Sequence, residues 1–269
     1  MNKKFIINAD DYGLSPGVSR GILELFRSGA VSSTSVLVNQ ADCVEQLQEL
    51  MNSGLPAGIH LNLTTGKPVL PAEKVPSLVN SKGRFHDLKK LWLLLQSGRL
   101  NPEEIRLELS AQVERMSASL KPDHFDGHQH FYFFSKKFAR IVFPLMRDFG
   151  IRETRLPFES RLFPGSHPVL VAKTLLLNWS VHKIIALLEK YNFSYPDSFF
   201  GQQFCGRWSL RDFTRVFRHA EGVTEIMVHP GFCDDLLRKR SRLSDQRERE
   251  LEVLRKIAGK ISLDSFGEI

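Results

Sequence analysis

Short apolar runs alternate with longer amphipathic segments along most of the chain. Eight runs rich in β-branched or other apolar residues predict strands at 5–9, 34–39, 57–63, 124–127, 154–156, 198–201, 225–228 and 261–263. The segments between them have helical length and apolar spacing, at about 16–28, 42–53, 87–97, 102–119, 136–149, 169–190, 209–219 and 243–258. This alternation favours βαβ units and a parallel sheet. Eight such units predict an α/β fold, a TIM-like (β/α) barrel in regular or distorted form, as a single domain over residues 1–269. An open doubly wound sheet is the alternative.

Polar residues interrupt these runs where the predicted strands end. They are Asp10 and Asp11 after the first run, His60 and Asn62 in the third, His124, Asp126, His128 and His130 around the fourth, and Glu225 and His229 at the seventh. In a parallel barrel or α/β sheet the carboxyl ends of the strands share one rim, where the reactive sites of such folds are built. We therefore expect these side chains to meet.

These residue types favour metal-assisted chemistry. One aspartate and two histidines from separate strands can hold a divalent ion and leave positions open for water and substrate. Of the adjacent Asp10 and Asp11, one can bind the ion while the other transfers protons. His229 is the candidate acid, and Arg155, at the end of the fifth predicted strand, would keep the base ionised by lowering its pKa. The plainer alternatives are a turn and helix cap for the aspartates, a core position for His60 and a rim ion pair for Arg155.

Composition narrows the class of protein. With 42% hydrophobic and 25% charged residues, the 269-residue chain is neither collagen-like nor of low complexity. Three widely spaced cysteines without a C-x-x-C pair argue against a disulfide framework. The N-terminus has too few consecutive apolar residues for a signal peptide, so we expect a cytoplasmic protein. Polar residues interrupt the most apolar stretch, 169–188, so no transmembrane segment is expected.

The charge balance is basic, with a formal net charge of +7 from 37 Lys and Arg against 30 Asp and Glu. The excess is spread along the chain and forms no basic stripe with interleaved aromatics, which argues against a nucleic-acid partner. One basic cluster lies at 238–242. We interpret it as a solvated loop, with an anionic ligand or peripheral membrane contact as the alternative.

Six stretches together resemble the YdjC-like carbohydrate deacetylase family, which includes chitooligosaccharide deacetylases. They are NADDYGLSPGVSRGI (8–22), SGAVSSTSVLVN (28–39), AGIHLNLTTGKPV (57–69), PSLVNSKGRF (76–85), PDHFDGHQH (122–130) and TEIMVHPG (224–231). The resemblance implies a (β/α)-barrel-like fold and hydrolysis of an acetamide on an amino sugar, with release of acetate. In its logic the family also resembles the NodB-type polysaccharide deacetylases, where the first aspartate of a pair is the base and the second a metal ligand.

By this resemblance, Asp11, His60 and His128 would hold one divalent metal ion. Asp10 would be the general base and His229 the acid. Magnesium is the ion usually given for the family, whereas an Asp/His/His set suits zinc on ligand softness, so both stay open. Four further residues would contact substrate or orient the ligands: Asn62, His124, Asp126 and His130.

The middle of the chain departs from the deacetylases of short oligosaccharides. Residues 156–170, the apolar 169–188 segment and the Phe-rich 199–204 look more like the hopanoid-biosynthesis branch of the same family. A glycolipid is therefore an alternative to an N-acetylated oligosaccharide as the small-molecule substrate. Other hypotheses are a phosphoesterase or other metallo-hydrolase on the same barrel, an iron oxygenase, and a non-catalytic carbohydrate- or lipid-binding protein. A homodimer is compatible with the sequence.

Overall fold

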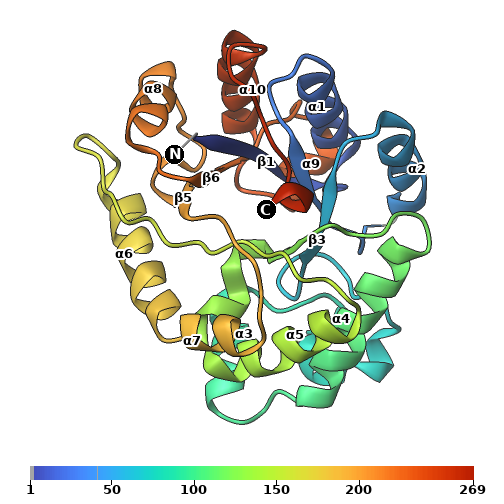
Figure 1. Cartoon of the computed structure of the whole chain (residues 1–269). Coiled ribbons are helices and arrows are strands. Elements are labelled where there is room, and N and C mark those ends of the chain that lie inside the picture. The colour runs from blue at the N-terminus through green and yellow to red at the C-terminus, as the bar shows by residue number, and fades with distance from the viewer. Residues whose placement is uncertain (1–2, 41) are drawn as a thin grey trace.

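Six parallel strands form one curled sheet in the middle of the protein (Figure 1). The computed structural model describes residues 3–40 and 42–269. In spatial order the strands run β4-β3-β2-β1-β6-β5. Their bounds are β1 (Lys4–Tyr12), β2 (Ser33–Val36), β3 (Ala57–Leu61), β4 (Phe125–Gly127), β5 (Ser198–Phe200) and β6 (Val223–Val228). β1 is buried from Phe5 to Tyr12, as expected for a parallel strand that is covered on both faces.

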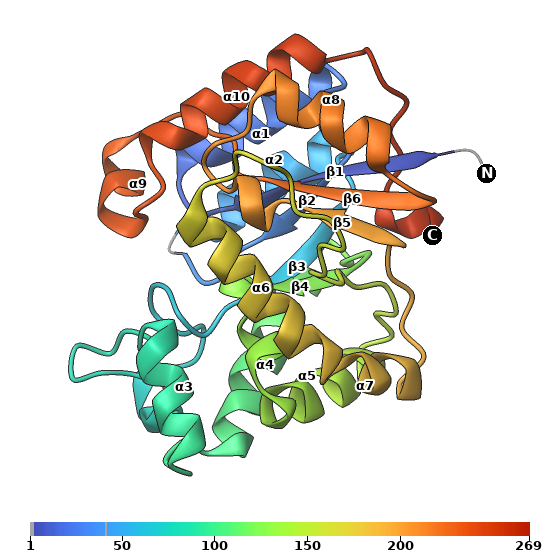
Figure 2. The ribbon, with the colours of Figure 1, turned by 90° about the vertical axis from the view of Figure 1, so that its left-hand side faces the viewer.

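Helices surround the sheet in both views (Figures 1 and 2). They are α1 (Pro16–Arg27), α2 (Cys43–Ser53), α3 (Leu88–Gln96), α4 (Pro102–Ser117), α5 (Lys136–Asp148), α6 (Pro168–His182), α7 (Ile185–Lys190), α8 (Leu210–His219), α9 (Asp235–Arg240) and α10 (Asp245–Ile257). Short 3₁₀ segments are η1 (Ala72–Lys74), η2 (Pro76–Leu78), η3 (His128–Phe134), η4 (Gln202–Phe204) and η5 (Phe266–Glu268). Helix α1 begins as its sequence predicts: Ser15 accepts a hydrogen bond from the Val18 N–H, and proline occupies the first helical position.

The α/β class and the alternation of parallel strands with helices are confirmed, but the closed eight-stranded form is wrong. Within the described residues, the chain at 153–156 makes only isolated bridges, Thr154 with Phe125 and Glu153 with Ser194. Pro157 then follows and offers no N–H to continue a ladder. Residues 261–263 form no strand, and only the N–H of Asp264 bonds to the start of β1, at Phe5 O (2.8 Å). The sheet therefore ends at β4 and β5 and curls into a half-barrel.

Two smaller expectations are also corrected. The predicted helix 169–190 is two helices, because the N–H groups of Lys183 and Ile184 turn back to carbonyls three residues earlier and end α6. The basic cluster is not a loop: Arg238 and Arg240 lie in α9, which Asp234 caps by accepting from the Leu237 N–H at 2.7 Å. Arg238 pairs with Asp245 (2.9 Å). Among the described residues, no helix is long and apolar enough to cross a membrane.

Candidate active site

A bulge in β1 lets two consecutive carboxylates, those of Asp10 and Asp11, reach the same rim of the sheet. Between Ala9 and Tyr12 the strand advances three residues while its partner β2 advances two, so one extra residue is inserted. Asp11 takes a φ of 74° there, which is unusual for a residue other than glycine. In a regular strand, neighbouring side chains point to opposite faces. The bulge removes this constraint, so Asp10 and Asp11 both reach the carboxyl-end rim.

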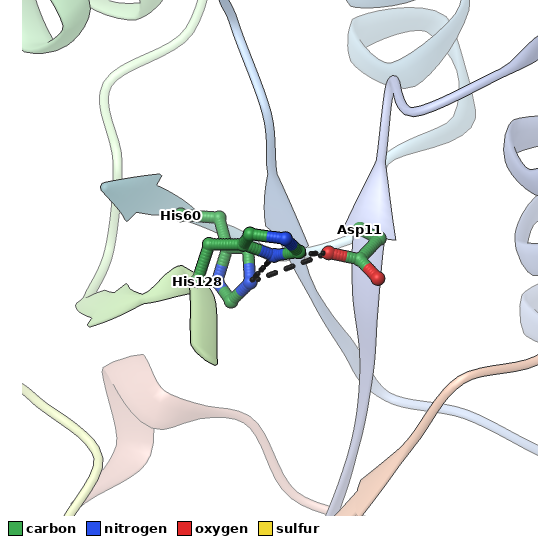
Figure 3. A group of neighbouring side chains, drawn as sticks. All are labelled: Asp11, His60 and His128. Atoms are coloured by element: carbon green, nitrogen blue, oxygen red, sulfur yellow. Dashed lines mark hydrogen bonds and ion pairs between the residues drawn. The ribbon is translucent and has the colours of Figure 1, made fainter. Parts of the chain in front are cut away.

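Asp11, His60 and His128 converge on one point (Figure 3). Asp11 Oδ1 lies 3.4 Å from His60 Nε2 and 2.9 Å from His128 Nδ1, and the two nitrogens are 3.3 Å apart. Ligand atoms at this spacing can share a cation whose bonds are roughly 2.0–2.2 Å long. Asp11 Oδ1 is buried and forms no hydrogen bond with the described residues. A buried carboxylate oxygen without a donor is costly, so the site fits a metal ion.

The charge at this point is negative enough to call for a cation. Burial would raise the pKa of Asp11, but the neighbouring His128 and Arg247 outweigh it and hold that pKa well below its usual value. Burial would lower the pKa of His60, but the carboxylates around it, Asp126 foremost, raise it to about 10. His60 therefore attracts positive charge, and a proton or a metal ion can supply it.

Asp126 orients His60 from the neighbouring strand. β3 and β4 pair with His60 directly opposite Asp126, and Asp126 Oδ1 lies 2.5 Å from His60 Nδ1. The other oxygen, Oδ2, accepts a hydrogen bond from the Ser35 hydroxyl at 2.8 Å. With Nδ1 engaged, the His60 ring presents Nε2 to Asp11 and His128. Such a carboxylate–histidine pair fixes the tautomer and raises the basicity of a metal-binding imidazole.

Asp10 is bound quite differently, by the buried Arg155. Arg155 Nη2 donates to Asp10 Oδ1 at 2.6 Å and Nη1 to Oδ2 at 2.7 Å, while Nε donates to Glu225 at 2.7 Å. Burial would raise the pKa of Asp10, but Arg155 outweighs it, so the carboxyl stays ionised. Asp10, His60 and Asp126 also lie close enough to hold an ion. Arg155 already contacts both Asp10 and Asp126, however, so the Asp11 cluster is the better candidate metal site.

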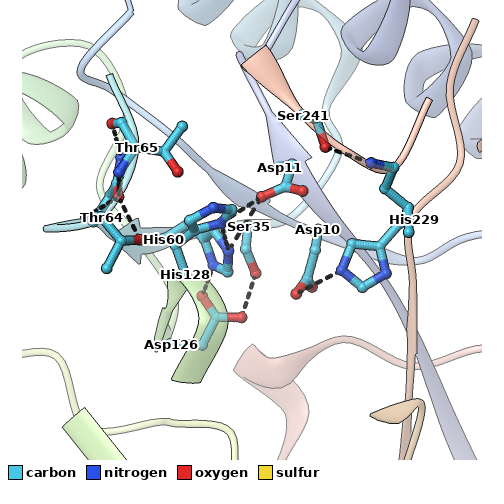
Figure 4. A network of polar contacts seen from close by, with 12 residues as sticks. Asp10, Asp11, Ser35, His60, Thr64, Thr65, Asp126, His128, His229 and Ser241 are labelled. Atoms are coloured by element: carbon cyan, nitrogen blue, oxygen red, sulfur yellow. Dashed lines mark hydrogen bonds and ion pairs between the residues drawn. The ribbon is translucent and has the colours of Figure 1, made fainter. Parts of the chain in front are cut away.

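His229 stands on the other side of Asp10, directly after β6 (Figure 4). Its Nε2 lies 3.9 Å from Asp10 Oδ2, and its Nδ1 lies 3.8 Å from Cys205 Sγ. Burial lowers the pKa of His229 to about 4, although the two aspartates oppose this. The imidazole is therefore neutral near pH 7. Its backbone N–H donates to Glu250 Oε2 at 2.6 Å, which fixes the position of the residue.

The remaining predicted residues lie around this centre rather than in it. Asn62 uses its amide inside the turn after β3, accepting from the N–H groups of Thr64 and Thr65 and donating to Thr65 O. His124 is buried below the site, where its ring stacks on Phe266 and its Nδ1 lies 2.6 Å from Asp123. His130 is buried in η3 with a φ of 54°, and its Nδ1 has no partner among the described residues. Burial lowers its pKa to about 3.

Comparison with known proteins identifies relatives of this chain. A model of the family described as YdjC-like protein matches residues 4–260. The chain belongs to the YdjC-like family. A chitooligosaccharide deacetylase from Yersinia enterocolitica is 30% identical over 99% of this chain and 96% of its own length. A carbohydrate deacetylase from Enterococcus faecalis is also 30% identical, over 99% of this chain and 95% of its own. Both relatives are named for the removal of acetyl groups from a carbohydrate.

A solved structure shares the whole fold of this YdjC-like chain. It is a crystal structure of an Enterococcus faecalis protein provisionally described as acting in cellobiose-phosphate cleavage. The two chains are 29% identical and superpose with a TM-score of 0.81, over 100% of this chain and 99% of that one. The half-barrel is therefore an architecture that the YdjC-like chain shares with this structure.

Two charged residues of α10 complete the site of the YdjC-like protein and were not among the predicted residues. Arg247 Nη2 donates to Asp11 Oδ2, the oxygen that points away from the two histidines. One turn later, Glu250 accepts from the N–H groups of Gly206 and His229, each at 2.6 Å. Both residues are buried, each with 1% of its surface exposed. One sequence signal could have revealed them: with Leu251 and Leu254 they occupy the i, i+3, i+4, i+7 positions where a helix faces the core.

Proposed function

We propose that this protein is a metal-dependent hydrolase that removes the N-acetyl group from an acetylated amino sugar and releases acetate. The observation that carries the proposal is the buried, hydrogen-bond-free oxygen of Asp11 facing His60 Nε2 and His128 Nδ1. A carboxylate held ionised and a neutral imidazole lie beside it, at Asp10 and His229. The names of the relatives support the same reaction and a sugar substrate.

Asp11, His60 and His128 would hold the ion. When bound, a divalent cation supplies a Lewis acid that polarises the acetyl carbonyl and lowers the pKa of water. Two imidazoles and one carboxylate are typical donors for zinc, whereas magnesium prefers oxygen ligands. We therefore favour zinc or a similar borderline ion over magnesium. Arg247 holds the second oxygen of Asp11 and so favours binding through Oδ1 alone.

Asp10 and His229 would move the protons. Asp10 is the general base, because Arg155 keeps it ionised and aims both of its oxygens. His229 Nε2 is the donor to the nitrogen that leaves. Because burial keeps this imidazole neutral, the ring must first gain a proton during the reaction before it can act as the acid. Asp10 Oδ2, 3.9 Å away, is the carboxylate oxygen placed to pass it on.

The competing functions have less support. A phosphoesterase needs a free cation for the phosphate, but at this rim Arg155 is engaged by Asp10, Asp126 and Glu225. A non-catalytic binding protein would have no need for two buried, ionised aspartates with different partners. An N-acetylated oligosaccharide fits the relatives' names best, and a glycolipid is the alternative. The cytoplasmic location stays a prediction, and so does the homodimer.

Acetate release from N,N′-diacetylchitobiose tests the proposal. We expect turnover by the purified chain, loss of turnover with a chelator, and recovery when zinc or another divalent ion is added back. An N-acetylglucosaminyl lipid assayed in parallel distinguishes the two substrate classes. If neither compound yields acetate in the presence of any divalent ion, the deacetylase proposal is wrong.

A further inference from the structure

The outer face of α6 is apolar and exposed. The helix lies on the outside of the protein, across the front of the view in Figure 2. Its inner face is buried through Thr174, Leu177, Ser180 and Val181. Its outer face carries Val169, Leu175, Leu176 and Trp179, which are 56%, 52%, 54% and 60% exposed. Among the described residues, only Val44 is another large apolar residue more than half exposed. A patch of this kind marks an interaction surface rather than ordinary surface variation.

The segment of the chain that carries this face has only basic charges. Residues 160–188 contain no aspartate or glutamate, but they contain Arg161, Lys173 and Lys183. Lys173 and Lys183 are both exposed, and the Lys183 ammonium lies over the Trp179 ring, 2.9 Å from its centroid. Lysines whose stems run beside leucine and tryptophan are typical of helices that lie in a membrane interface. The chain as a whole, at +7, is drawn to the same kind of anionic partner.

We propose that the outer face of α6 docks on an anionic lipid bilayer, with the helix lying in the plane of the interface. Basic residues complement anionic headgroups, whereas a symmetric contact with a second copy would bring this acid-free face against its own positive charge. Leucine and tryptophan enter the boundary between headgroups and acyl chains. The surface lies apart from the residues of the active site, so its test does not depend on the enzymatic activity.

Docking at α6 brings the bilayer close to the active site. The inner face of α6 packs against η3, whose first residue is His128, and against η4. A cavity of about 480 Å³ opens beside the first turn of α6, lined in part by Val169, Leu170 and Trp208. It extends to Cys205, whose sulfur lies 3.8 Å from His229 Nδ1. The cavity therefore lies between the first turn of α6 and a residue that is next to His229.

Vesicle flotation with the full chain tests the proposal. We expect binding to vesicles of equal parts phosphatidylglycerol and phosphatidylcholine, and little binding to phosphatidylcholine alone or at high salt. The double variant Leu175→Ser/Leu176→Ser should bind at least about tenfold more weakly, since it removes the apolar contribution. Lys173→Gln and Lys183→Gln should each weaken binding about fivefold, and only to the anionic vesicles.

Leu107→Ser is the matched control. Leu107 is 43% exposed on α4, whose first turn carries Glu103 and Glu104, so it should bind like the wild type. Circular dichroism checks that every variant is folded. Failure of the wild type to float with anionic vesicles overturns the proposal, and so does undiminished binding by the double variant. Gel filtration tests whether a second copy of the chain occupies this face instead. If the wild type does not float and is a dimer, while the double variant is a monomer, the face is a dimer interface and the membrane proposal is wrong.

Discussion

Asp10 and Asp11 are neighbours in the chain, yet the protein treats their carboxylates in opposite ways. Both oxygens of Asp10 accept hydrogen bonds from Arg155, and Asn8 adds a third to Oδ1 at 2.8 Å. Asp11 has one oxygen on Arg247 and leaves the other without a donor, facing two imidazole nitrogens. The protein thus satisfies Asp10 by itself but leaves Asp11 in need of a cation. A buried carboxylate with its partners in place suits proton transfer, and one with a missing partner suits metal binding.

Among the substitutions considered, we expect replacement of Asp11 to reduce turnover and metal binding the most. Asp11→Asn replaces a charged oxygen ligand by a neutral amide, so both bound metal and acetate release should fall, with turnover reduced at least about 10³-fold. Metal analysis of the dialysed variant, read beside its turnover, checks this. A variant that keeps full metal content would contradict the assignment of Asp11.

Asp10→Asn should distinguish the role of Asp10 from that of Asp11. It removes the proposed base without touching the metal ligands, so we expect turnover to fall about 10²- to 10⁴-fold while metal content stays at the wild-type level. Isothermal titration with zinc and the acetate assay measure the two properties on one sample. Parallel loss of metal and activity would mean that the aspartates are not functionally distinct.

Asp126→Asn tests the orientation of His60. The change leaves the side-chain shape but weakens the contact to His60 Nδ1, so metal affinity should drop about 10- to 100-fold. Excess metal should then restore most of the turnover, which it cannot do for Asp10→Asn. If excess metal restores nothing, Asp126 acts in some way other than through the ion.

The smallest effect on turnover is expected at Glu250, which supports the His229 side from α10. Burial raises the pKa of Glu250 from 4.5 to about 7. A carboxyl group with a raised folded-state pKa binds more protons in the folded than in the unfolded protein between these values. The free energy of unfolding therefore falls as pH rises from about 4.5 to about 7, by on the order of 2–3 kcal/mol.

Urea unfolding at several pH values should show this loss in the wild type and a smaller loss in Glu250→Gln, because burial also raises the pKa values of Glu159 and Glu225 to about 7 and these two groups still titrate in the variant. The same variant should keep zinc affinity and change turnover only a few-fold. An identical pH slope in the two proteins would show that Glu250 does not titrate in this range.

The sequence predicts the parts of this account that depend on local pattern. The strand ends at Asp10, His60, His128 and His229 are visible because polar residues follow apolar runs, and parallel strands share a rim. The bulge at Asp11 depends on pairing with β2, which no local pattern encodes. The prediction of an eight-stranded barrel was likewise wrong at 154–156, because this run looks like a strand in sequence but pairs only through an isolated bridge. Arg247 and Glu250 were missed because their partners lie more than 20 residues away in sequence.

The location of the bound ion tests the central claim most directly. Crystals of the protein soaked with zinc and measured at the zinc absorption edge give an anomalous map that places the ion independently of any assay. We predict one peak within bonding reach of Asp11 Oδ1, His60 Nε2 and His128 Nδ1, with Asp10 still paired to Arg155. A peak between Asp10 and Asp126, or none at this rim, would contradict the account.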